Sequence, residues 1–315
     1  MASKPALYQF PRLFRRVKHQ NDRIAQHLIR LREKKQYRHQ EGTLLIQGLA
    51  MVRDMRDSGV PLTSLVVTAM EEPYSEEAIK FPALQVMQNP DAFNAQHHYL
   101  VNVDLSRRIL GTAARPGRHE VFAEIPLPNH SLPPADKVDR MMVLDHVNDP
   151  SDLGNLVRTG KALGWGSGAI TTPLCDLYNL DTVRASRTAS LKWKYEQVPV
   201  NDLVAFLKSY DMTPLVADTL PATPTEDLWS PLTGKYDENR NPATVGSGPW
   251  LWNFTNNKQM ELPKRPALIL SAAHKGLQGL DDEIRIGMPM ADSTESLNVV
   301  SVGSLLMNEV NRLIK

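Results

Sequence analysis

Apolar residues follow a helical spacing near the start of the chain. Ile24, Leu28 and Leu31 recur every three or four residues, and arginines and lysines occupy positions between them. This pattern predicts an amphipathic helix over 21–35, with one apolar face and one basic face.

Short strands and a linker follow this helix. Residues 43–59 have the pattern of a strand that leads into a helix ending at Gly59, and 62–69 have the pattern of the next strand. The run at 125–140 is rich in proline, as linkers between domains are. We therefore predict four segments: a basic arm or targeting segment at 1–20, a first domain at 21–128, a linker at 129–139 and a second domain at 140–315.

The second half of the chain alternates strand and helix patterns. The apolar runs typical of strands are 141–147, 168–172, 196–200, 213–218 and 267–273. The helical patterns between them are 150–163, 180–192 and 201–209. This alternation predicts an α/β fold with a mostly parallel sheet. An insertion at 221–265 has no sustained period, and its tryptophans need cover from their own domain or from a partner.

Composition narrows the class of protein. A chain of 315 residues with 42% hydrophobic residues is long enough for two domains. Its single cysteine, Cys175, excludes an internal disulfide and a zinc site built from cysteines. The most apolar run, 266–273, is much shorter than the roughly 18 residues that span a bilayer, so membrane insertion is not expected.

Positive charge is concentrated at the N-terminus. Residues 1–39 hold eleven Lys and Arg against two acidic residues, Asp22 and Glu33. Such a stretch binds phosphate backbones, forms a solvated helix face or belongs to an import segment. Because residues 1–20 contain no acid and mix arginine with Leu and Phe, we expect a mitochondrial location, with a cytoplasmic one as the alternative.

Three stretches stand at the C-terminal ends of predicted strands of the second domain, where open α/β sheets bind ligands: 144–164, 268–277 and 286–306. The pattern Asp-Pro-x-Asn-x-Gly-x-x-x-Arg-[Ser/Thr] is matched by Asp149, Pro150, Gly154, Arg158 and Thr159. The pattern Ile-Pro-Met, a spacer and Ser-Leu-Asn-Val is matched by Pro289, Met290, Ser296, Leu297, Asn298 and Val299. In this order the stretches resemble the motifs of SPOUT methyltransferases, in the SpoU or TrmH-like branch, which methylates ribose 2′-hydroxyls of ribosomal and transfer RNA.

The resemblance implies an architecture. It covers nearly the whole chain, apart from the extreme N-terminus and the insertion. The family has a C-terminal, trefoil-knotted α/β methyltransferase domain, and the segment before it resembles the family's smaller L30e-like, RNA-binding α/β domain. The family also dimerises through its last helix. The apolar stripe from Val299 to Leu313 would serve a homodimer, a heterodimer with a SpoU-like paralogue, or core packing within one subunit.

The resemblance also assigns roles to residues. Arg158 is at the position of the family's catalytic arginine, and Ser296 and Asn298 would orient the ribose and that arginine, unless they only cap a helix. Arginine is a poor base, because its pKa exceeds about 12. The cofactor would be S-adenosyl-L-methionine, and the residues at the matching positions are Ser271, Gly276, Met288 and Leu297. The candidate RNA-binding residues of the basic helix are Arg30, Arg32, Lys34, Lys35 and Arg38.

Several positions depart from the family pattern. Asp152 replaces the asparagine of the first motif, where its charge would repel RNA phosphate or bind Arg158. Ser271 and Ala273 replace a glycine and a glutamate of the second motif, and Gln47 and Thr188 replace a customary Glu and Gly. Two hypotheses remain: an RNA 2′-O-methyltransferase that acts on ribosomal RNA during ribosome biogenesis, and a non-catalytic RNA-binding factor for ribosome assembly, paired with an active paralogue.

Overall fold

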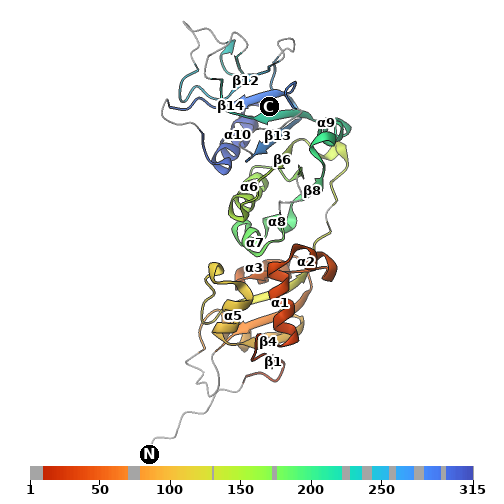
Figure 1. Cartoon of the computed structure of the whole chain (residues 1–315), viewed down its shortest axis with the longest axis vertical. Helices are drawn as coiled ribbons and strands as arrows, with labels where there is room; N and C mark the ends of the chain where they lie inside the picture. Colours follow the sequence, from red (N-terminus) through yellow and green to blue (C-terminus); the bar gives the residue numbers. More distant parts are fainter. Residues whose placement is uncertain are drawn as a thin grey trace, which may run out of the picture. The chain divides into compact units, whose positions relative to one another are not determined.

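A computed structural model describes residues 10–69, 79–129, 131–171, 176–221, 228–235, 243–254, 260–272, 280–291 and 296–314. The chain forms two compact units (Figure 1). Unit 1 comprises Met1–Pro128 and Tyr178–Leu191, and unit 2 comprises Asn129–Leu177 and Lys192–Lys315. No helix within the described ranges has the length and apolar character needed to cross a bilayer.

Unit 1 is built on a five-stranded sheet with the order β1-β4-β3-β5-β2. Its strands are β1 Phe14–Arg16, β2 Thr43–Gln47, β3 Leu62–Thr68, β4 Ala95–Val101 and β5 Val121–Pro126. Its α-helices are α1 Arg23–Glu33, α2 Lys35–Glu41, α3 Leu49–Asp57, α4 Ala83–Gln88, α5 Val103–Leu110 and α7 Leu180–Ser186, and α8 Ala189–Lys192 follows. Short 3₁₀ helices occur at Pro90–Phe93, Thr112–Ala114 and Ala135–Lys137, the last of them in unit 2.

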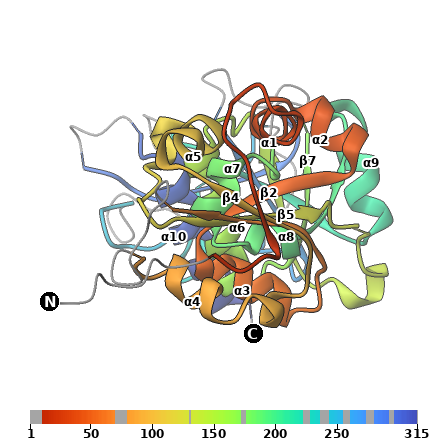
Figure 2. The same cartoon turned by 90° about the horizontal axis from the view of Figure 1, so that it is seen from below.

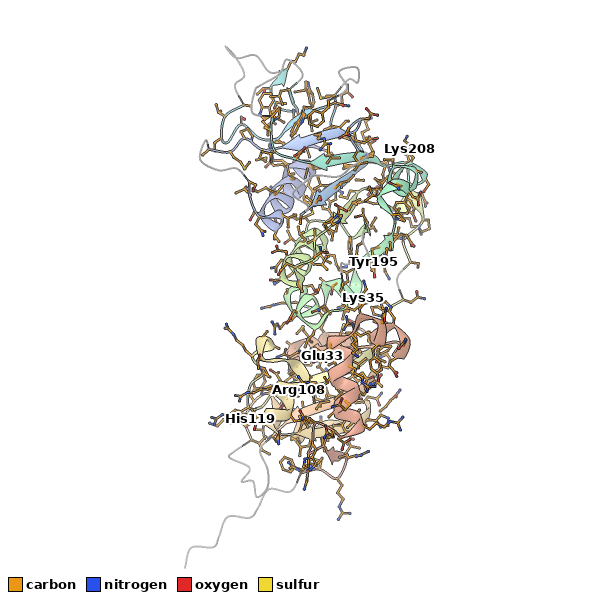
Figure 3. The ribbon with its side chains drawn as sticks, viewed as in Figure 1. Glu33, Lys35, Arg108, His119, Tyr195 and Lys208 are labelled. Carbon is orange, nitrogen blue, oxygen red and sulfur yellow. The ribbon has the colours of Figure 1, made fainter. Side chains whose placement is uncertain are left out.

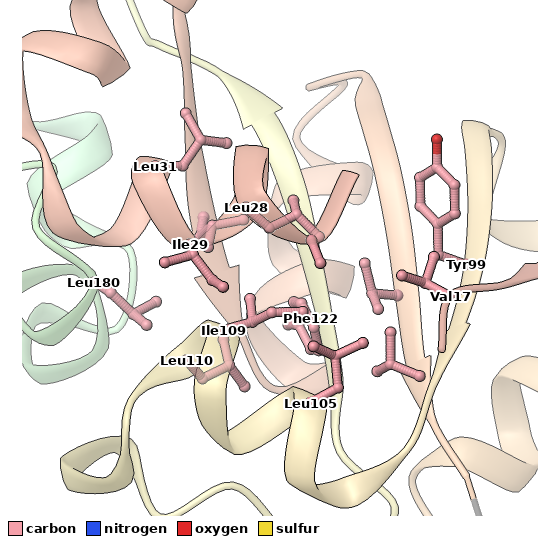
Figure 4. Packing of buried hydrophobic residues seen from close by; sticks show 14 of the residues in the cluster. Val17, Leu28, Ile29, Leu31, Tyr99, Leu105, Ile109, Leu110, Phe122 and Leu180 are labelled. Atoms are coloured by element: carbon pink, nitrogen blue, oxygen red, sulfur yellow. The ribbon is translucent and has the colours of Figure 1, made fainter. Parts of the chain in front are cut away.

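Helices cover both faces of this sheet. Figure 2 shows α1 and α5 on one side of the strands and α3 and α4 on the other. The apolar stripe of α1 is buried as its spacing predicts, and Leu28, Ile29 and Leu31 pack against α5 and against Leu180 of α7 (Figure 4). Burying this stripe is the main source of stability for a helix of this length.

The predicted basic helix is divided in two. Lys34 has an extended backbone, at φ −122° and ψ 109°, so α1 ends at Glu33 and α2 begins at Lys35. The buried Arg38 guanidinium binds the carbonyls of Leu31 and Arg32, at 2.5 and 3.0 Å from its Nη1. These carbonyls lie in the last turn of α1, where a helix leaves its acceptors unpaired.

Unit 2 is built on a nine-stranded sheet with the order β11-β10-β12-β14-β9-β13-β6-β7-β8. Its strands are β6 Met141–Asp145, β7 Ser167–Ile170, β8 Lys194–Gln197, β9 Thr213–Ala217, β10 Trp229–Ser230, β11 Gly234–Lys235, β12 Trp250–Trp252, β13 Pro266–Ser271 and β14 Ile284–Gly287. Its α-helices are α6 Pro150–Ala162, α9 Val200–Ser209 and α10 Val299–Leu313. The six strands from β14 to β8 pair in parallel, which confirms the predicted α/β fold.

The helices of unit 2 cover different faces of its sheet. Gly303 of α10 fits closely between Leu156 of α6 and Leu270 of β13, whereas α9 packs in a core with Ile269, the neighbouring residue of β13. Because successive strand residues point to opposite faces, α6 and α10 cover one face and α9 the other. The apolar stripe of α10 is therefore at least partly used in the core of its own unit.

One strand predicted from the sequence needs correction here, and the insertion has structure that its pattern did not indicate. The strand expected at 196–200 lies at Lys194–Gln197, because Pro199 caps the start of α9 at Val200. The insertion at 221–265 contributes three short strands, β10, β11 and β12, that extend the sheet antiparallel to β14. Trp250 and Trp252 are buried with Leu228, so their cover comes from their own unit.

Candidate active site and RNA-binding surface

The carboxyl ends of three neighbouring strands meet at a buried carboxylate. Asp145 ends β6, Ser271 ends β13 and Thr171 follows β7, and these strands are adjacent in the sheet. Asp145 is fully buried, and its oxygens accept hydrogen bonds from Ser271 Oγ at 2.7 Å and from Thr171 Oγ1. Ser271, which stands where the second SpoU-like motif has glycine, thus directs its hydroxyl to Asp145.

His146 shares the same carboxylate. Its Nδ1 lies 2.8 Å from Asp145 Oδ2, the oxygen that also accepts from Ser271. The His146 backbone is left-handed, with φ at 51°, and 44% of its side chain is exposed. The imidazole is therefore held at one nitrogen and open to solvent elsewhere.

A single asparagine joins the first turns of α6 and α10. Asn298 caps α10, because its Oδ1 accepts from Val300 N at 2.8 Å, and its Nδ2 donates to Asp152 Oδ2 at 3.1 Å. Asp152 stands in the first turn of α6, which Asp149 caps through the N–H groups of Ser151 and Asp152. The contact brings the first and third sequence motifs together. Asn298 both caps a helix and contributes to the candidate site.

Arg158 is exposed on α6, and no hydrogen bond or ion pair is found for it within the described part of the chain. It stands six residues after Asp152, which on a helix means roughly 9 Å along the axis and a different face. The expected tie between Asp152 and Arg158 is therefore absent among the described residues, and Asp152 binds Asn298 instead. Ser296 is exposed and stands two residues before Asn298, the N-cap of α10.

The residues predicted to hold the cofactor stand at the same edge of the sheet. Met288 follows β14 and is half-buried, and Leu297, 40% exposed, is an open apolar side chain beside Asn298. Gly276 and Ala273 lie outside the described residues. Within the described ranges, no group of three or more His, Cys, Asp or Glu side chains is arranged to hold a metal ion.

The five basic residues predicted to bind RNA lie in three different environments. Arg30 and Lys34 are exposed and Lys35 is half-buried, and all three line a surface hollow of about 450 Å³ together with Gln36, Tyr37 and Gln40. Arg32 instead pairs with Glu33, at 2.6 Å, and Glu33 also lies 3.8 Å from Arg108 of α5 (Figure 3). Arg38 is 2% exposed and does not belong to this surface.

Tyr37 connects the hollow to a buried acid. Its hydroxyl lies 2.9 Å from His27 Nδ1, and His27 Nε2 lies 2.9 Å from Glu124 Oε1. Glu124 also accepts from Thr43 and Ser64, each at 2.8 Å. Burial raises the pKa of the Glu124 carboxyl, but the hydrogen bonds and the nearby His27 outweigh it, so its pKa lies below the ordinary value. The ring of Tyr37, with Arg30 at 5.8 Å, is thus fixed in place.

The fold that holds this geometry is similar to that of solved methyltransferase structures. No family model matches the sequence. Solved structures do match: an RNA 2′-O ribose methyltransferase has a TM-score of 0.66 at 16% identity, with 95% of this chain and 99% of that chain covered. The SpoU methyltransferase AviRb from Streptomyces viridochromogenes, in complex with AdoMet, has a TM-score of 0.64 at 17% identity, covering 93% and 98%.

The chain has the SpoU methyltransferase fold. An AdoMet-bound rRNA methyltransferase from Sinorhizobium meliloti shares it, with a TM-score of 0.66 at 17% identity over 95% of this chain and 98% of that chain. The SpoU-type α/β fold implied by the sequence motifs is therefore confirmed, whereas the trefoil knot and the L30e-like character of the first domain stay predictions. In the SpoU fold of this chain, the carboxyl ends of β6 and β13 and the first turns of α6 and α10 form the candidate active site.

Sequence reasoning missed part of this site. Asp145 and His146 were not among the predicted residues, because their partners Thr171 and Ser271 are distant in sequence and meet them only through strand pairing. One signal was present. A carboxylate that ends the apolar run 141–144 must find hydrogen-bond donors when the strand is buried.

Proposed function

We propose that this protein is an S-adenosylmethionine-dependent RNA 2′-O-ribose methyltransferase. The observation that carries the proposal is the bond between Asn298 and Asp152, which joins the two matched motifs at one edge of a SpoU-type sheet. The chemistry needs a ribose hydroxyl held in line with a methyl donor, and two helix starts with polar side chains supply such positioning.

The side chains have distinct roles in this proposal. Arg158 binds a phosphate of the RNA, because its exposed guanidinium has no ion pair within the described ranges and its planar fork matches phosphate oxygens. Ser296 and Asn298 orient the ribose, and Asp152 fixes the amide of Asn298. Leu297 and Met288 give the apolar surface that an adenosyl group requires, with Ser271 beside them. S-adenosylmethionine, when bound, supplies the methyl group.

The substrate we propose is ribosomal RNA, modified during ribosome biogenesis in mitochondria. The acid-free segment 1–20 supports that location, and the basic hollow of unit 1 supports an RNA substrate. We further propose a dimer through α10, formed with a second copy or with a paralogue, because Leu305 of this helix is 45% exposed.

One alternative is a non-catalytic RNA-binding factor for ribosome assembly. It is favoured by two replaced positions, Asp152 and Ser271, both of which carry hydrogen bonds to neighbouring side chains. Under this alternative the site keeps its shape but does not transfer a methyl group.

Calorimetric titration of S-adenosylmethionine into the purified protein separates the two functions first. Micromolar binding is the result we expect. The absence of heat from a folded protein that still binds RNA would favour the assembly factor.

Methylation of ribosomal RNA by an Arg158→Ala variant is the second test. Removing one charged group from the reacting site lowers the rate by about 100-fold or more. The matched control is Lys208→Ala, which removes one exposed positive charge from α9 on the other face of the same sheet (Figure 3). Equal loss in both variants, or none in Arg158→Ala, would contradict the role of Arg158.

A further inference from the structure

The Asp145 carboxylate and the His146 imidazole have no role in the function proposed above. Asp145 accepts hydrogen bonds from side chains of three segments, the ends of β7 and β13 and the residue after β6. With both oxygens bound and no exposed surface, this carboxylate is fixed in position. A fixed carboxylate on one imidazole nitrogen is an arrangement that orients a histidine for proton transfer.

The hydrogen bond also selects the form of the imidazole. A carboxylate only accepts hydrogen bonds, so His146 Nδ1 donates to Asp145 Oδ2. In the neutral ring, Nε2 then carries the lone pair and is able to accept a proton. The left-handed backbone at His146 costs free energy in a residue other than glycine, and the same residue makes the contact with Asp145.

Two observations place His146 near the groups proposed to react: a shared hydrogen-bond acceptor and a short separation in sequence. Asp145 Oδ2 is the hydrogen-bond partner of both His146 and Ser271. The imidazole therefore lies beside a residue proposed to bind the cofactor. His146 also stands three residues before Asp149, the cap of α6, so their Cα atoms are at most about 11 Å apart. The bond from Asn298 to Asp152 lies in the same turn of α6.

We propose that His146, oriented by Asp145, accepts the proton of the ribose 2′-hydroxyl during methyl transfer. The inference rests on the methyltransferase function proposed above. As the hydroxyl oxygen forms its bond to the methyl carbon, the methyl–sulfur bond breaks with its electron pair remaining on sulfur. The proton moves to His146 Nε2 and then to water. Arg158 is a poor acceptor for that proton, because a guanidinium stays charged at neutral pH.

Thr171 and Ser271 are positioning residues in this scheme, because they act on His146 only through Asp145. The ionisable group that contacts His146 within the described ranges is Asp145. Asp149 and Asp152 follow on α6 and carry the same sign of charge. A general base must be unprotonated to accept a proton, so this scheme predicts a rate that falls toward acid pH.

Two substitutions test the inference while respecting the left-handed backbone. His146→Gly and His146→Asn both suit a positive φ, and both remove the titrating ring. The rate of methyl transfer in a single turnover is measured between pH 5.5 and 9 for each variant and for the original protein. Thermal unfolding and calorimetric cofactor binding check that fold and pocket survive.

We expect both variants to lose about 100-fold or more in rate together with the acid-side fall, and added imidazole to restore part of the rate in His146→Gly alone. The ¹⁵N-histidine spectrum gives a readout apart from turnover: RNA and S-adenosylhomocysteine together should shift the His146 ring signals. Variants that keep the original rate and pH profile, or ring signals that do not move, would overturn the role of His146. An original protein that methylates no RNA would instead overturn the function on which the inference rests.

Discussion

Thr188 takes a backbone conformation that a side chain branched at Cβ rarely adopts. Its φ is 68°, in the left-handed region, at a position where the resembling family has glycine. Thr188 is buried, and its Oγ1 donates to Asp54 Oδ2 of α3 at 2.5 Å. The hydrogen bond offsets a backbone that glycine would adopt without strain.

The first prediction compares Thr188→Gly with Thr188→Ala. Both variants lose the bond to Asp54, but only glycine removes the strain, so Thr188→Gly should be the more stable by about 1 kcal/mol. All five tryptophans belong to unit 2, so fluorescence does not report on unit 1. Hydrogen exchange of the slowest amides in β2, β3 and β5 measures the difference. An alanine variant at least as stable as the glycine variant would contradict it.

Glu124 gives unit 1 a dependence on pH. Its pKa is lower in the folded chain than its ordinary value, so the carboxylate stabilises the fold above that value, and the stabilisation is lost as pH falls through the folded pKa. Exchange protection of β2, β3 and β5 should therefore decline at acid pH.

The second prediction is that Glu124→Gln flattens this acid-side decline and costs about 1–3 kcal/mol at pH 7, because a neutral amide accepts less well from His27, Thr43 and Ser64. The tryptophan fluorescence transition of unit 2 is the internal control and should not move. If Glu124→Gln kept the original decline of exchange protection at acid pH, another ionisable group would be its cause.

At the scale of elements, periodicity identified most of the helices and strands but not the residues at which one element ends and the next begins. The spacing of Ile24, Leu28 and Leu31 predicts α1, yet the break at Lys34 depends on Arg38 reaching back to backbone carbonyls, which no periodic pattern shows. The strands of the insertion are two or three residues long, too short to show any period. The burial of Arg38 likewise could not be predicted, because in sequence it belongs to a stretch of basic residues typical of a solvent-exposed surface.

Gly287 provides the third prediction, because it ends β14 immediately before the proposed cofactor residue Met288. A Cβ there would lie 2.5 Å from the Asp218 carbonyl oxygen and 3.0 Å from the Trp252 ring. Since a backbone oxygen cannot give way easily, Gly287→Ala should cost about 1–3 kcal/mol in unit 2 and weaken S-adenosylmethionine binding. The control is Gly166→Ala, where a Cβ would meet nothing within 4 Å. Denaturation followed by tryptophan fluorescence compares them, and equal stability would refute the steric argument.

At the scale of the whole molecule, the chain contributes to unit 1 twice. Tyr178–Leu191 lies between strands of unit 2 in sequence, but its contacts belong to unit 1, where Leu180 is part of the core. The proline-rich run at 125–140 predicts a linker, but composition gives no sign of this second passage, because the segment has an ordinary helical pattern. Charge was more informative: the excess of positive residues in 1–39 includes those that line the hollow.

Salt dependence of RNA binding gives the last prediction. Each phosphate contact releases counterions, so the logarithm of the binding constant falls with the logarithm of salt by about 0.7 per contact for single strands. Reversing two charges of the hollow, with Arg30→Glu and Lys34→Glu together, should weaken binding and reduce that slope by about 1.4. The matched control reverses two exposed charges of unit 1 outside the hollow, Arg107 and Arg118. If both double variants lose affinity and slope equally, net charge rather than the hollow attracts RNA. If the hollow variant keeps both, RNA binds elsewhere.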